Sequence, residues 1–267
     1  MSSIDIVEKS ITLRSNGRDS LTCPCCGTES FMVPREKCIG TLDGRIYNLW
    51  TCLFCTAIIN RDDIEASIRE NSSISDQAES SHHFYDSSCL DESKIKKYIE
   101  GDQRIDFLIA NYPEVPRGVF LDFGAGQGFA ASSATKYFEK SIAFEISVEN
   151  IFRIHHMLPN KDRVEITNDI SEIEGFDVLF AFHVLEHIPD MLVVISNLIR
   201  RLNPGGALFF QVPLFRRDYL TRTHYTFMNS YACERLCEKL DLVVKGVWFD
   251  HDQDFITCIA CQAVRNT

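Results

Sequence analysis

The sequence predicts an α/β fold, a doubly wound and mostly parallel sheet of seven strands that closes with a reversed C-terminal β-hairpin and follows a small zinc ribbon. Three observations predict it. Short apolar runs alternate with helical stretches after residue 116, which is typical of parallel strands covered on both faces. A glycine-rich turn follows the first run, and two Cys-x-x-Cys pairs lie in the N-terminal quarter of the chain.

Composition limits the class of protein and its partners. The 267 residues are 45% hydrophobic and 24% charged, as in soluble globular proteins, and no apolar run approaches the ~20 residues of a membrane helix. The N-terminus has no signal-peptide pattern, so we expect a cytoplasmic protein without membrane insertion. The net charge of −11 repels phosphate backbones. Nucleic acid is therefore an unlikely partner.

The first predicted domain, residues 1–66, is the zinc ribbon. Six of the eleven cysteines fall within it, and four form two Cys-x-x-Cys pairs: Cys23, Cys26, Cys52 and Cys55. Each pair directs two sulfurs to one point, so two pairs complete a tetrahedron of thiolates around Zn²⁺. Cys25 is an alternative ligand. Four thiolates leave no open position, which predicts a structural zinc.

Residues 67–90 are predicted to be a linker or lid, because they are polar and rich in serine. Tyr85 in this segment is a candidate substrate contact if the segment covers the site, and an exposed linker aromatic otherwise. The third domain is predicted to span residues 91–267, and its first helix ends before the segment NYPEVP, from Asn111 to Pro116.

The elements of this domain follow in a regular order. We expect parallel strands at residues 119–123, 141–146, 164–167, 177–182 and 207–212, and helices ending at Tyr137, Leu202 and Leu240. The last two strands, 243–249 and 255–264, are joined by a short connection and must be antiparallel.

The glycine-rich turn is G124-A-G-Q-G128, at the point where the first strand meets its helix. This is the carboxyl edge of the sheet, where open α/β folds bind their ligands. The glycines allow close approach of a ligand to the backbone. A dinucleotide is disfavoured because Phe129 stands where its fingerprint requires the last glycine.

Two acidic residues indicate an adenosine ligand. Glu145 comes at the end of the second strand, where a carboxylate accepts hydrogen bonds from ribose hydroxyls. Asp169 follows the third strand, where it is placed to accept from the adenine amine. The alternative for each is an ordinary surface carboxylate.

These features resemble the class I S-adenosylmethionine-dependent methyltransferases, particularly the group of quinone and small-molecule enzymes. The resemblance rests on F120-L-D-F-G-A-G-Q-G128, Glu145, D177-V-L-F-A-F-H-V-L-E-H-I-P-D190, L202-N-P-G-G-A-L-F-F210 and H224-Y-T-F-M-N-S230, and covers roughly residues 90 to 264. It implies a Rossmann-like domain and S-adenosylmethionine as cofactor. The cofactor-binding residues that it implies are Asp122, Gly124, Gly126, Gly128, Glu145, Asp169, Ile170 and Phe182.

A tetracysteine ribbon before such a domain resembles the sugar-modifying methyltransferases. Those that methylate carbon usually carry a further C-terminal domain, whereas this chain ends after the predicted hairpin. We therefore expect O- or N-methylation of a small acceptor, a sugar or nucleotide-sugar-like metabolite. The alternatives are an RNA methyltransferase guided by the ribbon and a non-catalytic cofactor-binding protein. The sequence does not define an oligomeric state.

Methyl transfer to a hydroxyl needs an aligned acceptor and removal of a proton. The candidate catalytic bases are His183, His187 and His224. Alternatively, Glu186 and His187 are expected to form a hydrogen bond that caps the following helix and fixes the loop. A divalent ion held by His183, Glu186 and His187 is a further alternative.

The loop after the fifth strand offers candidate contacts for an anionic acceptor. Arg216 and Arg222 in this loop suit a phosphate or carboxylate, such as that of a nucleotide sugar. A solvated basic loop is the alternative.

Overall fold

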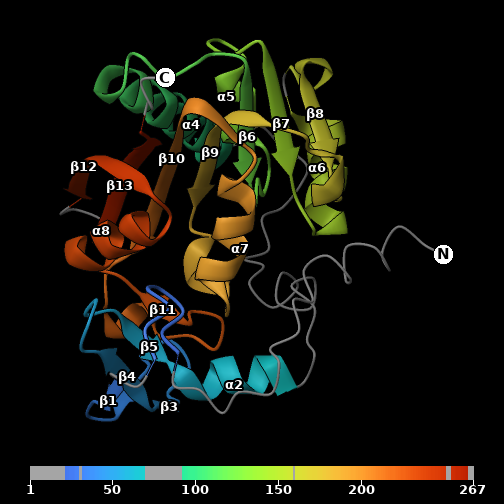
Figure 1. Ribbon diagram of the computed structural model, residues 1–267. Coiled ribbons are helices and arrows are strands. Elements are labelled where there is room, and N and C mark those ends of the chain that lie inside the picture. Colours follow the sequence, from blue (N-terminus) through green and yellow to red (C-terminus); the bar gives the residue numbers. More distant parts are fainter. Residues whose placement is uncertain (1–21, 30–31, 70–91, 159, 251–253, 264–267) are drawn as a thin grey trace.

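The computed structural model describes residues 22–29, 32–69, 92–158, 160–250 and 254–263. It consists of a large sheet with helices on both faces and a smaller unit of short strands at one edge of that sheet (Figure 1). Most of the predicted linker, together with Tyr85, lies outside the described residues.

The large sheet confirms the predicted α/β architecture. Its seven strands lie in the order β12-β13-β10-β9-β6-β7-β8. Their bounds are β6 Val119–Phe123, β7 Lys140–Phe144, β8 Val164–Thr167, β9 Phe176–Phe182, β10 Leu202–Pro213, β12 Leu242–Asp250 and β13 Phe255–Gln262. β13 is antiparallel to both of its neighbours, and β6 to β10 are parallel.

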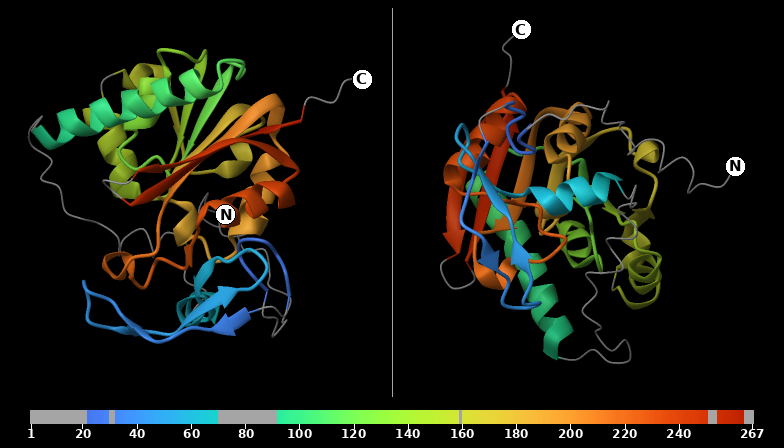
Figure 2. Two further views of the ribbon diagram at one scale, coloured as in Figure 1. Left: turned by 90° about the vertical axis from the view of Figure 1, so that its left-hand side faces the viewer. Right: turned by 90° about the horizontal axis from the view of Figure 1, so that it is seen from below.

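Helices cover both faces of this sheet (Figures 1 and 2). They are α4 Glu92–Asn111, α5 Phe129–Ala134, α6 Val148–Met157, α7 Met191–Ile199 and α8 Ser230–Lys239. The apolar side chains of α4 and α5 pack with Phe180 and Phe209 of the sheet, whereas those of α7 and α8 pack with Leu179 and Phe210. Because consecutive residues of a strand point to opposite faces of the sheet, a single strand such as β9 supplies apolar side chains to the cores on both faces.

Several boundaries differ from the sequence expectation. The helix expected to reach Tyr137 ends at Ala134, and β10 begins at Leu202, five residues before the predicted strand at Ala207. α6 was not among the expected elements. It begins after Ser147, whose hydroxyl accepts a hydrogen bond from the backbone N–H of Asn150, as is common at helix N-termini.

The N-terminal unit contains β1 Met32–Pro34, β2 Cys38–Ile39, β3 Ile46–Tyr47, β4 Leu49–Cys52, β5 Ile58–Asn60 and α2 Arg61–Arg69. We call residues 22–69 the N-terminal unit. α2 extends three residues past the boundary expected at residue 66. The main sheet of the N-terminal unit has the strand order β1-β4-β5-β11. The strand β11, Thr226–Phe227, comes from the loop after β10 of the large sheet. The two predicted domains therefore share a sheet.

The N-terminal unit also shares a core with the large domain. Cys25, Ala57 and Ile59 are buried in the same apolar cluster as Met228 and Ala232. The backbone N–H of Leu192 donates a hydrogen bond to the carbonyl of Pro24 at 3.0 Å. Figures 1 and 2 show the unit beneath α7 and α8, beside the carboxyl ends of the parallel strands.

Within the described residues, the structure contains no helix that is both long and apolar enough to span a bilayer.

Candidate active site and cysteine centre

The glycine turn joins β6 to α5 with three residues in the left-handed region. The φ angles of Gly124, Gly126 and Gly128 are +74°, +56° and +76°. The backbone N–H of Gly124 donates to the carbonyl of Phe144 at 2.9 Å, which fastens the turn to β7. A Cβ at Gly124 would meet Val184 at 2.6 Å and one at Gly128 would meet Ile154 at 3.2 Å, but one at Gly126 would enter open space. Only Gly126 thus faces a volume that a ligand can occupy.

Glu145 follows β7 directly and holds this turn. Its carboxylate accepts hydrogen bonds from the backbone N–H of Gly126 at 2.7 Å and from those of Ile146 and Ser147 at 2.8 Å. Asn150 adds a longer contact of 3.4 Å. Burial raises the pKa of Glu145 despite these donors. A buried carboxylate beside the open face of Gly126 is well placed for ribose hydroxyls.

Asp122 lies within β6, below the turn. Its side chain is almost fully buried, and one oxygen accepts a hydrogen bond from the backbone N–H of Ala131 in α5 at 3.0 Å. Burial raises the pKa of Asp122 to about 7, although that hydrogen bond and the charge of Arg104 act in the opposite direction. This carboxyl group is therefore poised to ionise when a cation approaches.

Arg104 is a candidate site residue that the sequence analysis did not identify. Its guanidinium lies 4.9 Å from the centre of the Phe182 ring, and burial lowers its pKa. The residue stands four positions before buried Leu108 and three after buried Gly101, on the inward face of α4. A cation at that helical spacing among apolar residues is the signal that could have identified it.

The remaining predicted cofactor residues lie near the same edge. The Asp169 carboxylate accepts from the backbone N–H and the hydroxyl of Ser171, at 2.8 and 2.6 Å, and so caps the short helix η2, Ile170–Glu172. Ile170 packs partly buried against the main core. Phe182 ends β9 and stacks on Phe180 with ring centres 4.2 Å apart.

Three imidazoles and a carboxylate lie close together at the carboxyl end of β9. Glu186 lies in the short helix η3, Leu185–His187, and is 1% exposed. His224 comes from the loop before β11, yet its ring centre is 4.6 Å from that of His187. His183 lies at the edge of the group, with its Nδ1 3.6 Å from Glu186 Oε1. The structure thus brings the three predicted catalytic histidines around one buried carboxylate.

The electrostatics of this group follow from its burial. Burial alone would raise the pKa of Glu186, but the adjacent imidazole of His183 and the other nearby histidines lower it. Burial and the neighbouring His187 lower the pKa of His224 to about 4. The group therefore pairs an ionised Glu186 with a neutral His224 at neutral pH.

His183 has an unusual backbone. Its φ angle is +56°, a conformation that costs a non-glycine residue energy and that recurs at functional sites. Its side chain is 34% exposed and packs edge-on against Phe255. The strained turn holds this imidazole at the surface of the group, while Glu186 remains inside it.

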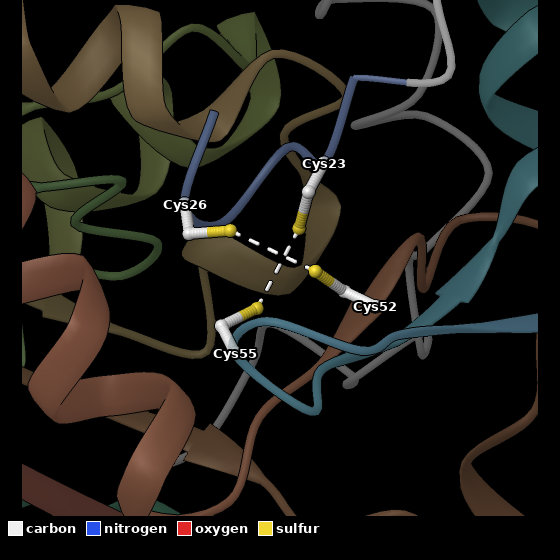
Figure 3. A group of neighbouring side chains, drawn as sticks. All are labelled: Cys23, Cys26, Cys52 and Cys55. Atoms are coloured by element: carbon white, nitrogen blue, oxygen red, sulfur yellow. Dashed lines mark hydrogen bonds between the residues drawn. The ribbon is translucent and has the colours of Figure 1, made fainter. Parts of the chain in front are cut away.

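Four cysteines of the N-terminal unit converge as the sequence predicted (Figure 3). The sulfurs of Cys23 and Cys55 are 3.6 Å apart, and those of Cys26 and Cys52 are 3.7 Å apart. A disulfide would require about 2.05 Å, whereas a tetrahedron of thiolates with Zn–S bonds of about 2.3 Å has edges of about 3.8 Å. The donor set and its spacing therefore fit a four-coordinate Zn²⁺.

The two Cys-x-x-Cys turns also have the same backbone form. Gly27 and Thr56, each directly after the second cysteine of a pair, have φ angles of +67° and +63°. Each donates its N–H to the carbonyl of the first cysteine, at 2.8 Å. Cys25 contacts Met228 and the carbonyl of Ala232 instead, so it serves packing between the two parts of the molecule.

The predicted acceptor residues differ in their surroundings. Arg216 forms ion pairs with Asp254 and with Asp218. Arg222 is exposed in the same loop, close in sequence to His224. Arg222 is thus the arginine more readily available to an anionic acceptor.

The fold and the site define the class of protein. The strand order, with its single reversed strand, and the glycine turn beside Glu145 are those of a class I S-adenosylmethionine-dependent methyltransferase. A family model described as a methyltransferase domain matches residues 95–245. The chain belongs to this methyltransferase family.

Known relatives agree with this assignment. A ubiquinone biosynthesis O-methyltransferase of Aliivibrio fischeri is 30% identical over 190 residues, which cover 61% of this chain and 76% of that protein. Among solved structures, an S-adenosylmethionine-dependent methyltransferase of Leishmania major aligns over 62% of this chain and 72% of its own, with a TM-score of 0.52 and 15% identity. An amino pentose methyltransferase of Micromonospora echinaspora, from calicheamicin biosynthesis, aligns over 68% of this chain and all of its own, with a TM-score of 0.51 and 13% identity. At these identities the structural likeness shows the fold alone.

Proposed function

We propose that this S-adenosylmethionine-dependent methyltransferase methylates an oxygen of a small hydroxylated acceptor, a sugar or nucleotide-sugar-like metabolite. The observation that carries the proposal is the position of the polar group formed by His183, Glu186, His187 and His224. Val184 directly follows His183, and its side chain lies against Gly124 of the glycine turn. The polar group, which is the proposed acceptor site, therefore lies next to the glycine turn, which is the proposed cofactor site.

The residues of the turn fit S-adenosylmethionine. The open space at Gly126 admits the cofactor, and the Glu145 carboxylate can exchange a backbone partner for ribose hydroxyls. Arg104 offers a guanidinium for the methionine carboxylate. Asp169, Ile170 and Phe182 would border the adenine and the reactive end. When bound, the cofactor supplies an activated sulfonium methyl group.

The chain's own part in the reaction is to align the acceptor and to remove its proton. With His183 Nδ1 turned toward Glu186, its Nε2 can take the proton of an acceptor hydroxyl as the oxygen gains the methyl group. Glu186 would stabilise the imidazolium that results. Arg222 provides the contact for an anionic acceptor.

The choice of O-methylation is supported by the relatives that are named O-methyltransferases. RNA as the acceptor is disfavoured by the charges of the N-terminal unit. Arg45 forms an ion pair with Asp63, and Arg35 lies 5.6 Å from the ring centre of Phe215. Each guanidinium therefore has a partner within the chain, but both side chains are exposed, so the net charge of −11 is the stronger argument against RNA.

We assign a structural role to the cysteine centre. Its four thiolates would leave a bound Zn²⁺ without an open position. The bound metal would fix the two Cys-x-x-Cys turns, and with them β4 and β5, of which β5 pairs with β11.

The function is tested by incubating the protein with S-adenosylmethionine labelled in its methyl group and with separate pools of nucleotide sugars, free sugars, phenols and RNA. We expect label in the sugar or nucleotide-sugar pool, with loss of label in Glu145→Ala. Glu149→Ala, on the exposed face of α6, is the matched control and should retain transfer. Label confined to phenols or RNA would replace the proposed acceptor. Cofactor binding without transfer to any pool would indicate a non-catalytic binding protein.

A further inference from the structure

Glu186, His187 and His224 have the arrangement of metal ligands. One ligand atom from each lies within 4.8 Å of the other two. Two of these residues come from η3 and the third from the loop before β11. These two segments are tied together, because the backbone N–H of Tyr225 donates to the carbonyl of Glu186 at 2.8 Å.

Hydrogen bonds orient both imidazoles toward the carboxylate. His187 Nδ1 lies 2.9 Å from the carbonyl oxygen of Thr223, and His224 Nδ1 lies 2.6 Å from that of Tyr219. A carbonyl can only accept, so each Nδ1 carries a proton and each Nε2 keeps its lone pair. In a metal-binding histidine, the ring nitrogen that does not bind the metal usually donates its N–H to a carboxylate, a backbone carbonyl or water.

The carboxylate supplies an independent observation. Glu186 is 1% exposed, and its Oε2 is buried without a hydrogen-bond partner. A buried, unpaired carboxylate oxygen is costly. A divalent cation would satisfy this oxygen together with the two lone pairs, and no further protein group would have to move into the site.

We propose that Glu186, His187 and His224 bind a divalent transition-metal ion at the acceptor side of the active site. Two imidazoles and one carboxylate favour ions such as Mn²⁺, Fe²⁺, Co²⁺ or Zn²⁺ over Mg²⁺ or Ca²⁺. Bonds of about 2.0–2.2 Å require the widest of the ligand separations to shorten on binding. The ligand set differs from the sequence expectation, because His224 replaces His183.

Three protein ligands leave positions open for an acceptor oxygen. The ion would lower the pKa of a bound hydroxyl, whose proton would pass to His183 or to water as the oxygen–methyl bond forms and the sulfur–methyl bond of S-adenosylmethionine breaks, with its electron pair left on the sulfur. This catalytic role rests on the proposed methyl transfer to oxygen. Ion binding itself does not, so the two can be tested separately.

The test is a titration with Mn²⁺ alone of protein that contains a single Zn²⁺ per chain, held by the cysteine centre, followed by the electron paramagnetic resonance signal of free Mn²⁺. We expect one Mn²⁺ per chain in the wild type. Glu186→Gln and His224→Gln should each weaken binding by at least about 100-fold, more than the loss of a supporting residue usually costs. His156→Gln, on the exposed face of α6, should leave Mn²⁺ binding unchanged.

His183→Gln distinguishes the two possible ligand sets. The His183→Gln variant should retain Mn²⁺ binding. If His183→Gln loses Mn²⁺ binding while His224→Gln retains it, the assignment of His224 as a ligand is overturned. S-adenosylmethionine binding shows that each variant is folded. A folded wild type that binds no Mn²⁺ would overturn the metal site, even if methyl transfer is observed. Full transfer activity after Mn²⁺ removal would overturn its catalytic role.

Discussion

The backbone N–H of Asn60 donates a hydrogen bond to the carbonyl of Tyr225 at 2.8 Å, and the N–H of Tyr225 donates to the carbonyl of Glu186 at the same distance. Tyr225 thus joins the last strand of the N-terminal unit to the backbone of Glu186, whose side chain belongs to the proposed acceptor site. His224 directly precedes it. The cysteine centre therefore supports the loop that carries a proposed active-site residue, and is more than an attached module.

Loss of zinc should consequently impair the enzyme as well as the N-terminal unit. We expect wild-type protein to contain one zinc per chain at the cysteine centre, and Cys52→Ser to lose it. The midpoint of thermal unfolding should fall by about 5 °C or more, because metal-binding energy stabilises the fold, and methyl transfer should decrease. Zinc analysis and calorimetry of both proteins provide the measurements.

Cys38→Ser is the matched control, since Cys38 is partly exposed and lies outside the four-cysteine cluster. It should keep its zinc, its stability and its activity. Retention of zinc and thermal stability in Cys52→Ser would contradict the assignment of the metal centre.

Two glycines of the turn should respond differently to the same change. Both Gly126→Ala and Gly128→Ala place a side chain at a positive φ angle, which costs about 1–2 kcal/mol. At Gly128 the new methyl group also presses on Ile154, while at Gly126 it enters the open space assigned to the cofactor. Gly126→Ala should therefore weaken cofactor binding by about tenfold or more, and Gly128→Ala should lose more stability.

Calorimetric titration with S-adenosylmethionine and thermal unfolding separate these two effects. Equal cofactor affinity in Gly126→Ala and wild type would show that the cofactor lies elsewhere.

Local patterns predicted the fold well. Strands such as 119–123 and 164–167 were predicted at their observed bounds, because their apolar runs lie between clear turn signals. The two Cys-x-x-Cys pairs were equally informative, since their spacing alone determines which sulfurs can meet.

Contacts between distant segments could not be predicted in this way. β11 has two residues, and only its pairing with β5 makes it a strand. His224 joins Glu186 and His187 through folding of the loop after β10, and no spacing in the sequence indicates that they meet. The alternative of a divalent ion that the sequence suggested therefore used residues close in sequence, His183, Glu186 and His187.

Arg104 should bind the amino-acid end of the cofactor. Arg104→Gln removes a partly buried cation, so binding of S-adenosylmethionine should weaken about 10- to 100-fold, as expected for a charge-assisted hydrogen bond. Binding of 5′-methylthioadenosine, which lacks the carboxylate, should change little. Fluorescence or calorimetric titration with both ligands gives the comparison.

Lys96→Gln is the control for this change, because Lys96 lies on the exposed side of the same helix. An equal loss of affinity for both ligands in Arg104→Gln would indicate a general disturbance of α4.

Asp122 should make cofactor binding depend on pH. Burial raises its pKa to about 7, well above that of an unfolded aspartate. Its contribution to stability is thus complete below about pH 4 and is lost as the pH rises toward 7. A cationic cofactor favours the ionised carboxylate, so affinity should rise about tenfold from pH 6 to pH 8. The charges that face Asp122 are Arg104, from α4, and Glu145, after β7.

Asp122→Asn tests this assignment, because an amide does not titrate in this range. The variant should bind S-adenosylmethionine more weakly at pH 8 and show a much flatter pH profile. Glu145 is also buried and has a raised pKa, and it would contribute in the same direction, so Glu145→Gln is measured in parallel. If the slope persists in Asp122→Asn and disappears in Glu145→Gln, the titrating group is Glu145, and the proton released on binding comes from the ribose side of the site.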